Sequence, residues 1–183
     1  MVDAQMFTVT SLSSNTAFWS SLRLEGPSFF GCNMGLCIPF ALGLTAAFPK
    51  RQVIALDSDG SLMVDTSSLI TVADVNPTHF LAIVFDNGSY ARMGSTFTAR
   101  RTDLEKIAQG AGIANTTTAR TEEAFAAAVK QALESTGPSF IVAKVEPDKE
   151  RVHGDPHRTY GRAMREWFVD AVRRHPDYQQ ARK

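Results

Sequence analysis

The sequence predicts an α/β protein with a mostly parallel sheet and helices on both faces. Three observations predict this fold class. Short apolar runs rich in β-branched residues recur along the chain, and such runs are typical of buried parallel strands. Stretches with apolar residues at helical spacing lie between them, so strands and helices alternate. Turn residues separate the segments, and we count about five or six strands.

The expected elements follow one another in regular order. Each expected strand is a short apolar or β-branched run, and the expected helices carry apolar residues at helical spacing. The expected strands are residues 6–12, 28–30, 52–56, 80–85, 112–115 and 139–145. The expected helices are residues 15–22, 35–48, 62–75, 103–110, 122–135 and 157–174. Residues 90–101 are expected to form an irregular loop.

Proline and capping residues set the limits of several elements. Pro27 and Pro77 follow the first and third expected helices, and Pro138 precedes the last strand. Thr121 is placed to cap the helix over residues 122–135. Pro176 is expected to end the last helix and to leave a frayed tail.

Length and composition narrow the class of protein. The 183 residues are enough for one domain with a full core. The 19 basic and 19 acidic residues cancel, which argues against binding to nucleic acid or to a membrane surface. Cys32 and Cys37 do not make a disulfide framework, and neither a signal peptide nor a bilayer-spanning run is visible. We therefore expect a cytoplasmic protein.

The segment over residues 52–90 organises the chain. It reads as a strand, an acidic turn at 57–61, a helix, a second strand and a polar turn at 86–89. Parallel strands joined by a helical crossover place both turns at the carboxyl edge of the sheet, where open α/β sheets bind ligands. Asp59 and Asn87, 28 positions apart (87 − 59), are therefore expected to face each other.

These two turns carry groups that suit a metal and a phosphate. A carboxylate, an amide oxygen and a backbone carbonyl are ligands for Mg²⁺ or Ca²⁺. Ser61 is placed to cap the following helix, whose first N–H groups can bind a phosphate. Together they predict a site for a diphosphate and its metal ion.

Residues 59–61 (Asp-Gly-Ser) followed by 86–87 (Asp-Asn) resemble the Gly-Asp-Gly and Asn-Asn signature of thiamine-diphosphate enzymes. The signature belongs to their diphosphate-binding domain. In that family the aspartate, the second asparagine and the carbonyl two residues further on hold Mg²⁺ on the cofactor. The resemblance therefore implies Asp59, Asn87 and the Ser89 carbonyl as metal ligands.

The match has two departures from the signature. Ser58 stands in place of its first glycine and Asp86 in place of its first asparagine. Neither change removes a ligand, although Ser58 brings a side chain to a point where the backbone approaches the cofactor. We also expect Gly60, Ser61 and Tyr90 to belong to the cofactor site.

A second block strengthens the resemblance. Residues 31–35 and 39–43 are similar to acetolactate synthases, benzoylformate decarboxylases and sulfopyruvate or phosphonopyruvate decarboxylases. The resemblance implies that the Met34 N–H and the Cys32 carbonyl contact the aminopyrimidine, with Asn33 between them. It also implies that the Met34 side chain holds the cofactor in its bent form.

Each candidate has a simpler alternative. Asp59 and Asn87 are common turn residues, and a methionine such as Met34 is usually core filler. The ordered pair of blocks favours the cofactor site. His79 and His175 are interpreted as solvated loop or helix-end residues.

The resemblance implies a thiamine-diphosphate-binding fold over residues 1–146, with residues 147–183 as a linker and C-terminal amphipathic helix of the same domain. In the family, a glutamate on a separate pyrimidine-binding domain activates the cofactor. Only about thirty residues precede Gly31, too few for that domain. We therefore expect a partner chain to supply the glutamate, as in sulfopyruvate decarboxylases whose domains are separate subunits.

The expected function is that of the diphosphate-binding subunit of a split decarboxylase. It would use thiamine diphosphate and Mg²⁺, form a hetero-oligomer and act on a small 2-oxo acid. Arg92 is a weak candidate for binding an anionic substrate, and a surface ion pair is the alternative. Two other functions stay open: a subunit of a carboligase similar to acetolactate synthase, and a non-catalytic cofactor-binding module.

Overall fold

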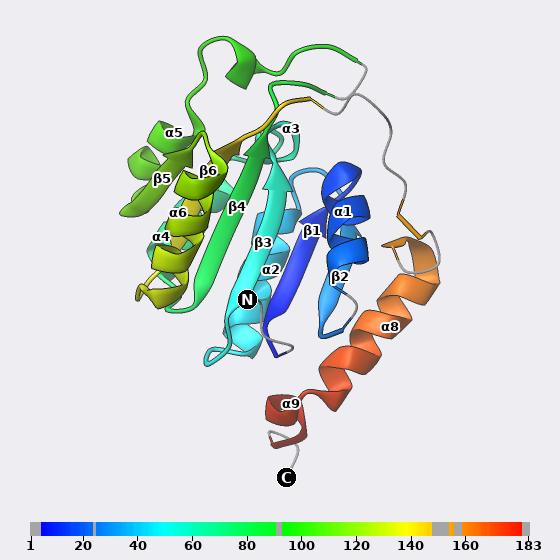
Figure 1. Ribbon diagram of the computed structural model, residues 1–183. Coiled ribbons are helices and arrows are strands. Elements are labelled where there is room, and N and C mark those ends of the chain that lie inside the picture. The colour runs from blue at the N-terminus through cyan, green and yellow to red at the C-terminus, as the bar shows by residue number, and fades with distance from the viewer. Residues whose placement is uncertain (1–4, 24, 91–92, 148–153, 156–158, 181–183) are drawn as a thin grey trace.

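The computed structural model describes residues 5–23, 25–90, 93–147, 154–155 and 159–180. Six parallel strands form one sheet in the order β2-β1-β3-β4-β6-β5 (Figure 1). The strands are β1 (Phe7–Ser11), β2 (Ser28–Cys32), β3 (Val53–Ser58), β4 (Phe80–Asp86), β5 (Asn115–Ala119) and β6 (Ser139–Lys144). The predicted α/β class with a parallel sheet is confirmed.

Helices cover both faces of the sheet, as predicted. They are α1 (Ser14–Leu22), α2 (Cys37–Ala47), α3 (Asp59–Leu62), α4 (Ser68–Val75), α5 (Leu104–Ala111), α6 (Glu122–Glu134), α8 (Gly161–Arg174) and α9 (Pro176–Gln180), with one 3₁₀ turn, η1 (Phe97–Ala99). Helices α1 and α6 lie on one face, and α2, α4 and α5 lie on the other (Figure 1).

The central strands explain this two-sided packing. Ile54 and Leu56 of β3 belong to the apolar cluster that includes α6, and Val53 and Ala55 belong to the cluster that includes α2. Successive side chains of a strand point to opposite faces, so a strand covered on both sides must be apolar throughout. Burial on both faces accounts for the continuous apolar runs in the sequence.

Strand register places the polar turns at one edge. Strands β3 and β4 pair in register up to Ser58 and Phe85. The residues that follow these strands therefore leave the sheet side by side. Strand β1 lies between β2 and β3, so the chain changes direction across the sheet between β1 and β3, at the kind of point where α/β sheets bind ligands.

The single helix predicted over residues 62–75 is wrong, because two short helices stand in its place. The chain leaves α3 after Leu62 and enters α4 at Ser68. Between them, the Asp65 side chain accepts a hydrogen bond from the Ser68 N–H, and the Ser68 hydroxyl donates to the Asp65 carbonyl. These short side chains offer the backbone alternative partners, which interrupts the helix.

The strand predicted over residues 112–115 is also wrong in position. Gly112 has a left-handed φ of 104° and ends α5, and the strand starts at Asn115. Strand β5 is a threonine-rich edge strand with side chains that alternate between exposed and partly buried. A search for apolar runs misses it because a half-exposed edge strand needs few apolar residues.

The C-terminal part packs against the edge of the sheet. Helix α8 lies against β2 (Figure 1), and the Phe168 ring meets the Phe29 ring edge to face at 5.4 Å. Pro176 was expected to leave a frayed tail, but it begins the short helix α9, since proline is tolerated in a first helical turn. Arg51 holds α9 through a two-point ion pair with Asp177, at 2.6 Å for each contact.

His175 corrects another expectation, because it is buried and not solvated. Its ring lies 5.0 Å from the Phe7 ring and 5.4 Å from the Phe48 ring. Its Nδ1 accepts a hydrogen bond from the Asp177 N–H, and Nε2 lies 3.2 Å from the Gln5 carbonyl oxygen. His175 therefore ties the corner between α8 and α9 to the base of the sheet.

Among the described residues, every helix is too short or too polar to cross a lipid bilayer.

Candidate functional site

The loops that follow β2, β3 and β4 meet at the carboxyl edge of the sheet, which is the upper edge in Figure 1. The Gly35 N–H donates to the Ser61 hydroxyl oxygen at 3.2 Å, and this bond joins the turn after β2 to α3. The Thr98 hydroxyl lies between Asp59 and Asp86, which joins α3 to the end of β4. The structure thus brings together the three loops that the sequence analysis selected.

Asp59 lies at the centre of this edge and is only 1% exposed. Its Oδ2 accepts hydrogen bonds from the hydroxyls of Thr96, at 2.6 Å, and Thr98, at 2.9 Å. Burial raises the pKa of Asp59, the two hydroxyls lower it, and the nearby charge of Asp86 raises it again. A divalent cation at this carboxylate would offset both of the effects that raise the pKa.

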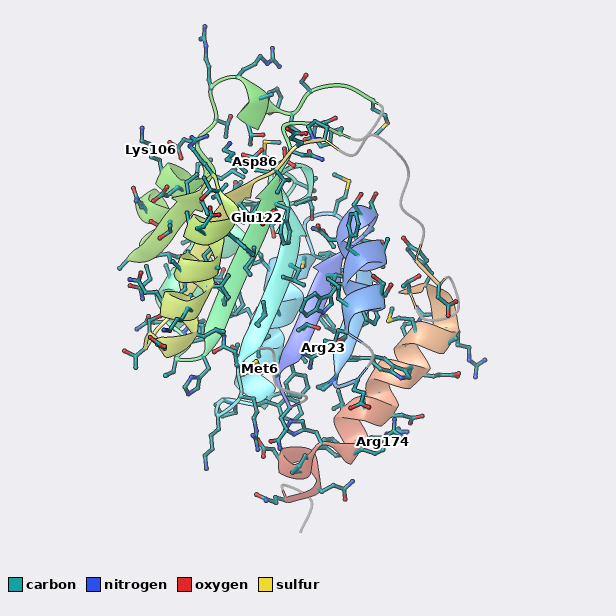
Figure 2. All side chains as sticks on the ribbon, in the orientation of Figure 1. Met6, Arg23, Asp86, Lys106, Glu122 and Arg174 are labelled. Carbon is teal, nitrogen blue, oxygen red and sulfur yellow. The ribbon has the colours of Figure 1, made fainter. Side chains whose placement is uncertain are left out.

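Asp86 departs from the family signature, and other residues of the chain neutralise its negative charge and satisfy its hydrogen bonds. Its Oδ2 forms an ion pair with Lys144 at the end of β6. Its Oδ1 accepts the Gly88 N–H at 3.1 Å and lies 2.8 Å from the Thr98 hydroxyl, whose one proton it shares with Asp59 Oδ2. Figure 2 shows Asp86 at the carboxyl end of the central strands. Asp86 is thus satisfied by its own neighbours and serves to hold the loop that carries Asn87.

Asn87 and Ser89 lie in a small hairpin after β4. The Asn87 Oδ1 accepts the Ser89 N–H at 2.9 Å, which fixes the turn. Ser89 bridges Ser95 in antiparallel fashion, and the two ladder bonds run from the Tyr90 N–H to the Gly94 carbonyl and from the Thr96 N–H to the Gly88 carbonyl. These bonds hold Asn87 and Ser89 in a closed turn beside the end of β4.

The start of α3 differs from the expectation at its cap. Ser58, and not Ser61, is the N-cap, and its hydroxyl oxygen accepts the Ser61 N–H at 3.3 Å. The helix has only four residues, so its dipole is a weak anion attractant. Tyr90 lies over Gly60, where an added Cβ would come within 2.6 Å of the Tyr90 ring. Glycine is therefore required at position 60 for steric reasons.

The turn after β2 presents the second predicted block. Met34 is 39% exposed at this turn, while Cys32 at the end of β2 is buried. Burial raises the pKa of the Cys32 thiol to about 11, with the charge of Asp57 as a second cause, so the thiol stays protonated. Asn33 is exposed, and its carbonyl accepts the Leu36 N–H at 3.0 Å. Part of the Met34 side chain is thus open to a ligand or a partner chain.

Asp57 is a buried acid that the sequence analysis treated only as a turn residue. It is 1% exposed, and burial raises its pKa from 3.8 to about 6 despite hydrogen bonds from Ser61, Ser58 and Ser11. The Asn15 amide donates to the Asp57 carbonyl at 2.8 Å and ties α1 to this edge. Asp57 lies near the carboxyl end of β3. Strand β3 pairs with β1, and the chain changes direction across the sheet between these two strands.

The donors at this edge fit a divalent ion that also binds an anionic ligand. Asp59 offers a carboxylate, Asn87 an amide oxygen and Ser89 a carbonyl oxygen, and all three types are oxygen ligands of hard cations. Within the described ranges, no group of three or more His, Cys, Asp or Glu side chains could hold a metal. A metal ion would therefore be held by the single carboxylate of Asp59, by neutral oxygens and by oxygens of its ligand.

The sequence predicts the two loop tips but not the side chains that hold them. Thr96 and Thr98 fall in the segment expected to be an irregular loop, and Lys144 ends an apolar strand. The one available signal was Lys144 itself, because a lysine at the end of a buried strand needs an acidic partner. Arg92 lies outside the described residues, so its predicted contact with substrate stays a prediction.

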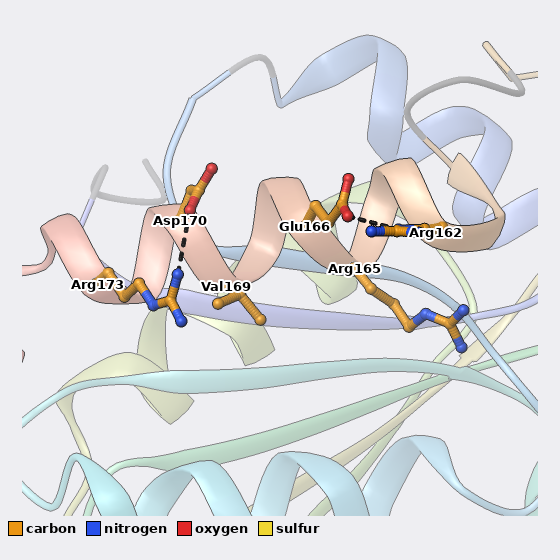
Figure 3. A pocket seen from close by; sticks show the side chains of 6 residues that line it. All are labelled: Arg162, Arg165, Glu166, Val169, Asp170 and Arg173. Atoms are coloured by element: carbon orange, nitrogen blue, oxygen red, sulfur yellow. Dashed lines mark hydrogen bonds and ion pairs between the residues drawn. The ribbon is translucent and has the colours of Figure 1, made fainter.

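A hollow on the outer surface of α8 lies apart from this edge (Figure 3). Two ion pairs within the helix flank it: Arg162 with Glu166 at 2.6 Å, and Arg173 with Asp170 at 3.8 Å. Charges paired along one exposed helix face are typical of a solvated surface. We assign no ligand to it.

The fold and the site define a ligand-binding α/β protein whose oxygen donors gather at the carboxyl edge of an open parallel sheet. The chain belongs to the family described as thiamine pyrophosphate enzyme, C-terminal TPP binding domain, which matches residues 13–143. Thiamine diphosphate is therefore the cofactor of this domain, and the predicted family and fold are confirmed.

Relatives agree with this family. The chain is 36% identical over 121 residues to the sulfopyruvate decarboxylase subunit beta of Methanocaldococcus jannaschii, covering 65% of this chain and 63% of that subunit. It is 34% identical to the sulfopyruvate decarboxylase of Methanosarcina acetivorans, covering 63% of this chain but 30% of that protein. The chain thus spans less than two thirds of either relative.

A solved structure shows the same fold. The thiamine diphosphate-dependent 4-hydroxybenzoylformate decarboxylase of Rhodococcus jostii RHA1 aligns with a TM-score of 0.67 and 26% identity. The alignment covers 81% of this chain and 31% of that one.

Proposed function

We propose that this chain is the diphosphate-binding subunit of a split 2-oxo acid decarboxylase that uses thiamine diphosphate and Mg²⁺. One observation carries the proposal. In a member of the thiamine pyrophosphate family, Thr98 ties the buried carboxylate of Asp59 to Asp86, the residue before Asn87. The two loop tips that the metal site requires are therefore held together.

Named residues would hold each part of the cofactor. Asp59, Asn87 and the Ser89 carbonyl would bind Mg²⁺ on the diphosphate. The bound cofactor supplies an electron sink for the carbanion formed when carbon dioxide leaves a 2-oxo acid. The other residues that we place at the cofactor are Cys32, Asn33, Met34, Ser58, Gly60, Ser61 and Tyr90.

The charges of the chain suit this role. Lys144 neutralises Asp86, so Asp59 is left as the carboxylate of the metal site. Two hydroxyls on Oδ2 stabilise the ionised form of Asp59, which is the form that binds a cation. Exposed Met34 can support the cofactor from below without displacing core residues.

A partner subunit would complete the site. The relative from Methanocaldococcus jannaschii is named a beta subunit, and the chain matches only 30% of the Methanosarcina acetivorans protein. Large apolar side chains are exposed on loops at the carboxyl edge, and they mark a surface that another chain would cover. They are Leu12, Met34, Leu36, Val64, Met93, Phe97 and Val145.

The substrate class follows from the cofactor and the relatives. We propose a small 2-oxo acid, with sulfopyruvate as the first candidate because relatives carry that name. Cys32 and Cys37 are both free thiols, which suits a cytoplasmic protein. The glutamate that activates the cofactor would come from the partner, so we assign no catalytic residue to this chain.

Co-expression with a candidate pyrimidine-binding partner tests the proposal. We expect the purified pair to release carbon dioxide from sulfopyruvate in the presence of thiamine diphosphate and Mg²⁺, and the chain alone to release none. Asp59→Ala should abolish turnover, while Asp74→Ala, at an exposed site on α4, should leave it unchanged. Turnover by the chain alone would refute the split-subunit proposal. A carbon–carbon bond in the product would indicate the carboligase alternative.

A further inference from the structure

Two threonines in the loop after β4 hold one side of the Asp59 carboxylate. The Thr96 and Thr98 hydroxyls lie 2.6 Å and 2.9 Å from Asp59 Oδ2 and 2.7 Å from each other. Thr96 is fully buried, so water does not compete for its hydrogen bond. Both hydroxyls are on Oδ2, and Oδ1 receives neither of them.

The same segment also holds the second half of the predicted metal site. The Thr96 N–H donates to the Gly88 carbonyl at 2.9 Å, directly between Asn87 and Ser89. The Thr98 hydroxyl reaches Asp86 Oδ1 at 2.8 Å, and Lys144 fixes the other oxygen of Asp86. The segment therefore determines both the orientation of Asp59 and its distance from the Asn87 loop.

We infer that Thr96 and Thr98 are positioning residues that make the site selective for Mg²⁺ over Ca²⁺. This inference rests on the proposed function. With Oδ2 held by two hydroxyls, Asp59 offers a metal ion one oxygen and not two. Mg²⁺ requires near-octahedral geometry, whereas Ca²⁺ takes roughly six to eight oxygens and accepts a carboxylate through both of its oxygens.

Removing the two hydroxyls should therefore change the preference between the ions. The variant Thr96→Val/Thr98→Val keeps the branched shape of both side chains and frees Oδ2. We expect the Mg²⁺ concentration needed for half-maximal cofactor binding to rise about 10- to 100-fold, as for other residues that orient a metal ligand. The corresponding Ca²⁺ concentration should rise less, so the ratio between the ions shifts toward Ca²⁺.

Calorimetric titration of the full chain with thiamine diphosphate, in series of MgCl₂ and CaCl₂ concentrations, measures this ratio without any catalytic assay. Thr98→Val alone should move the ratio in the same direction by less, and it serves if the double variant fails to fold. Thr98→Ser, which keeps the hydroxyl, should restore the wild-type ratio.

Thr118→Val is the matched control. The Thr118 hydroxyl also binds a carboxylate, that of Glu105, but it lies on the edge strand β5. Its loss should leave the ion preference unchanged.

The outcomes separate this inference from the proposed function. If the wild-type chain binds no cofactor with either ion, whether alone or together with the pyrimidine-binding partner, the proposed function fails and the inference fails with it. If the wild-type chain binds but the variants weaken both ions equally, or neither ion, the positioning role is refuted and the proposed function stands. A shift toward Ca²⁺ that Thr98→Ser reverses and Thr118→Val does not reproduce supports the inference.

Discussion

At the scale of the residue, the clearest consequence concerns the buried acid Asp57. Its pKa is about 6 in the folded chain against a usual value of 3.8, because burial disfavours the charged form. Between these values the folded state binds more protons than the unfolded state. The contribution of Asp57 to stability is therefore fully present below about pH 4 and is lost as the pH rises through 6.

We predict that Asp57→Asn stabilises the chain at neutral pH. Asparagine can accept the Ser58 N–H as the carboxylate does, and it has no charge to bury. The gain in the free energy of unfolding should approach about 3 kcal/mol at pH 7, because the proton affinity of Asp57 differs between the folded and unfolded chains, and it should vanish near pH 4. Urea unfolding of both chains from pH 4 to 8 measures the difference.

Asp103 provides the control for this prediction. Its pKa is lowered by the hydrogen bond from the Lys106 N–H at the start of α5, so it contributes stability at neutral pH that acid removes. Asp103→Asn should therefore show a pH dependence of opposite sign. A gain for Asp57→Asn that is equal at every pH would contradict the assignment of a raised pKa.

The residue scale also shows what the sequence could predict about the site. The positions of Asp59 and Asn87 at one edge follow from two parallel strands and the polar turns after them, and the strand register confirms that placement. Thr96 and Thr98 could not be found in this way, because they return to the site from an irregular loop. Loop paths do not follow a sequence period.

At the scale of the element, the packing of helix α8 determines how much the C-terminal region contributes to the stability of the fold. Phe168 is buried and meets Phe29 of β2 and Phe40 of α2. Phe168→Ala should lower the free energy of unfolding by about 3 kcal/mol, through lost contacts and the cavity left behind. Thermal and urea unfolding measure the loss.

Val169 is the matched control on the same helix. It follows Phe168 directly but is exposed, so Val169→Ala should change stability by less than about 0.5 kcal/mol. Equal effects of the two substitutions would show that α8 does not pack through Phe168.

Elements also differ in how readily the sequence predicts them. Strands β3, β4 and β6 were found because burial on both faces makes their sequences continuously apolar. The break between α3 and α4 was missed because apolar spacing continues across it, while Asp65 and Ser68 bond to the backbone locally. Apolar periodicity does not show where short polar side chains compete with the helix for backbone hydrogen bonds.

At the scale of the whole molecule, alternation of strands and helices predicted the sheet, its parallel strands and its two helical layers. It did not predict which surfaces stay exposed. One such surface is the carboxyl edge, where exposed apolar side chains surround the site. If a partner covers this edge, substitutions there should weaken assembly and leave the isolated chain folded.

Leu36 and Val75 allow a matched test, since they are 52% and 53% exposed. Leu36 lies on the carboxyl edge at the N-cap of α2, and Val75 ends α4 near the opposite edge of the sheet. Serine is a good N-cap, so Leu36→Ser should not harm α2. We expect it to weaken binding to the pyrimidine-binding partner about tenfold, because a buried apolar side chain is lost from the interface. Val75→Ser should leave binding unchanged. Calorimetric titration of each variant with the partner measures both affinities. Equal weakening by both substitutions would place the partner elsewhere on the molecule.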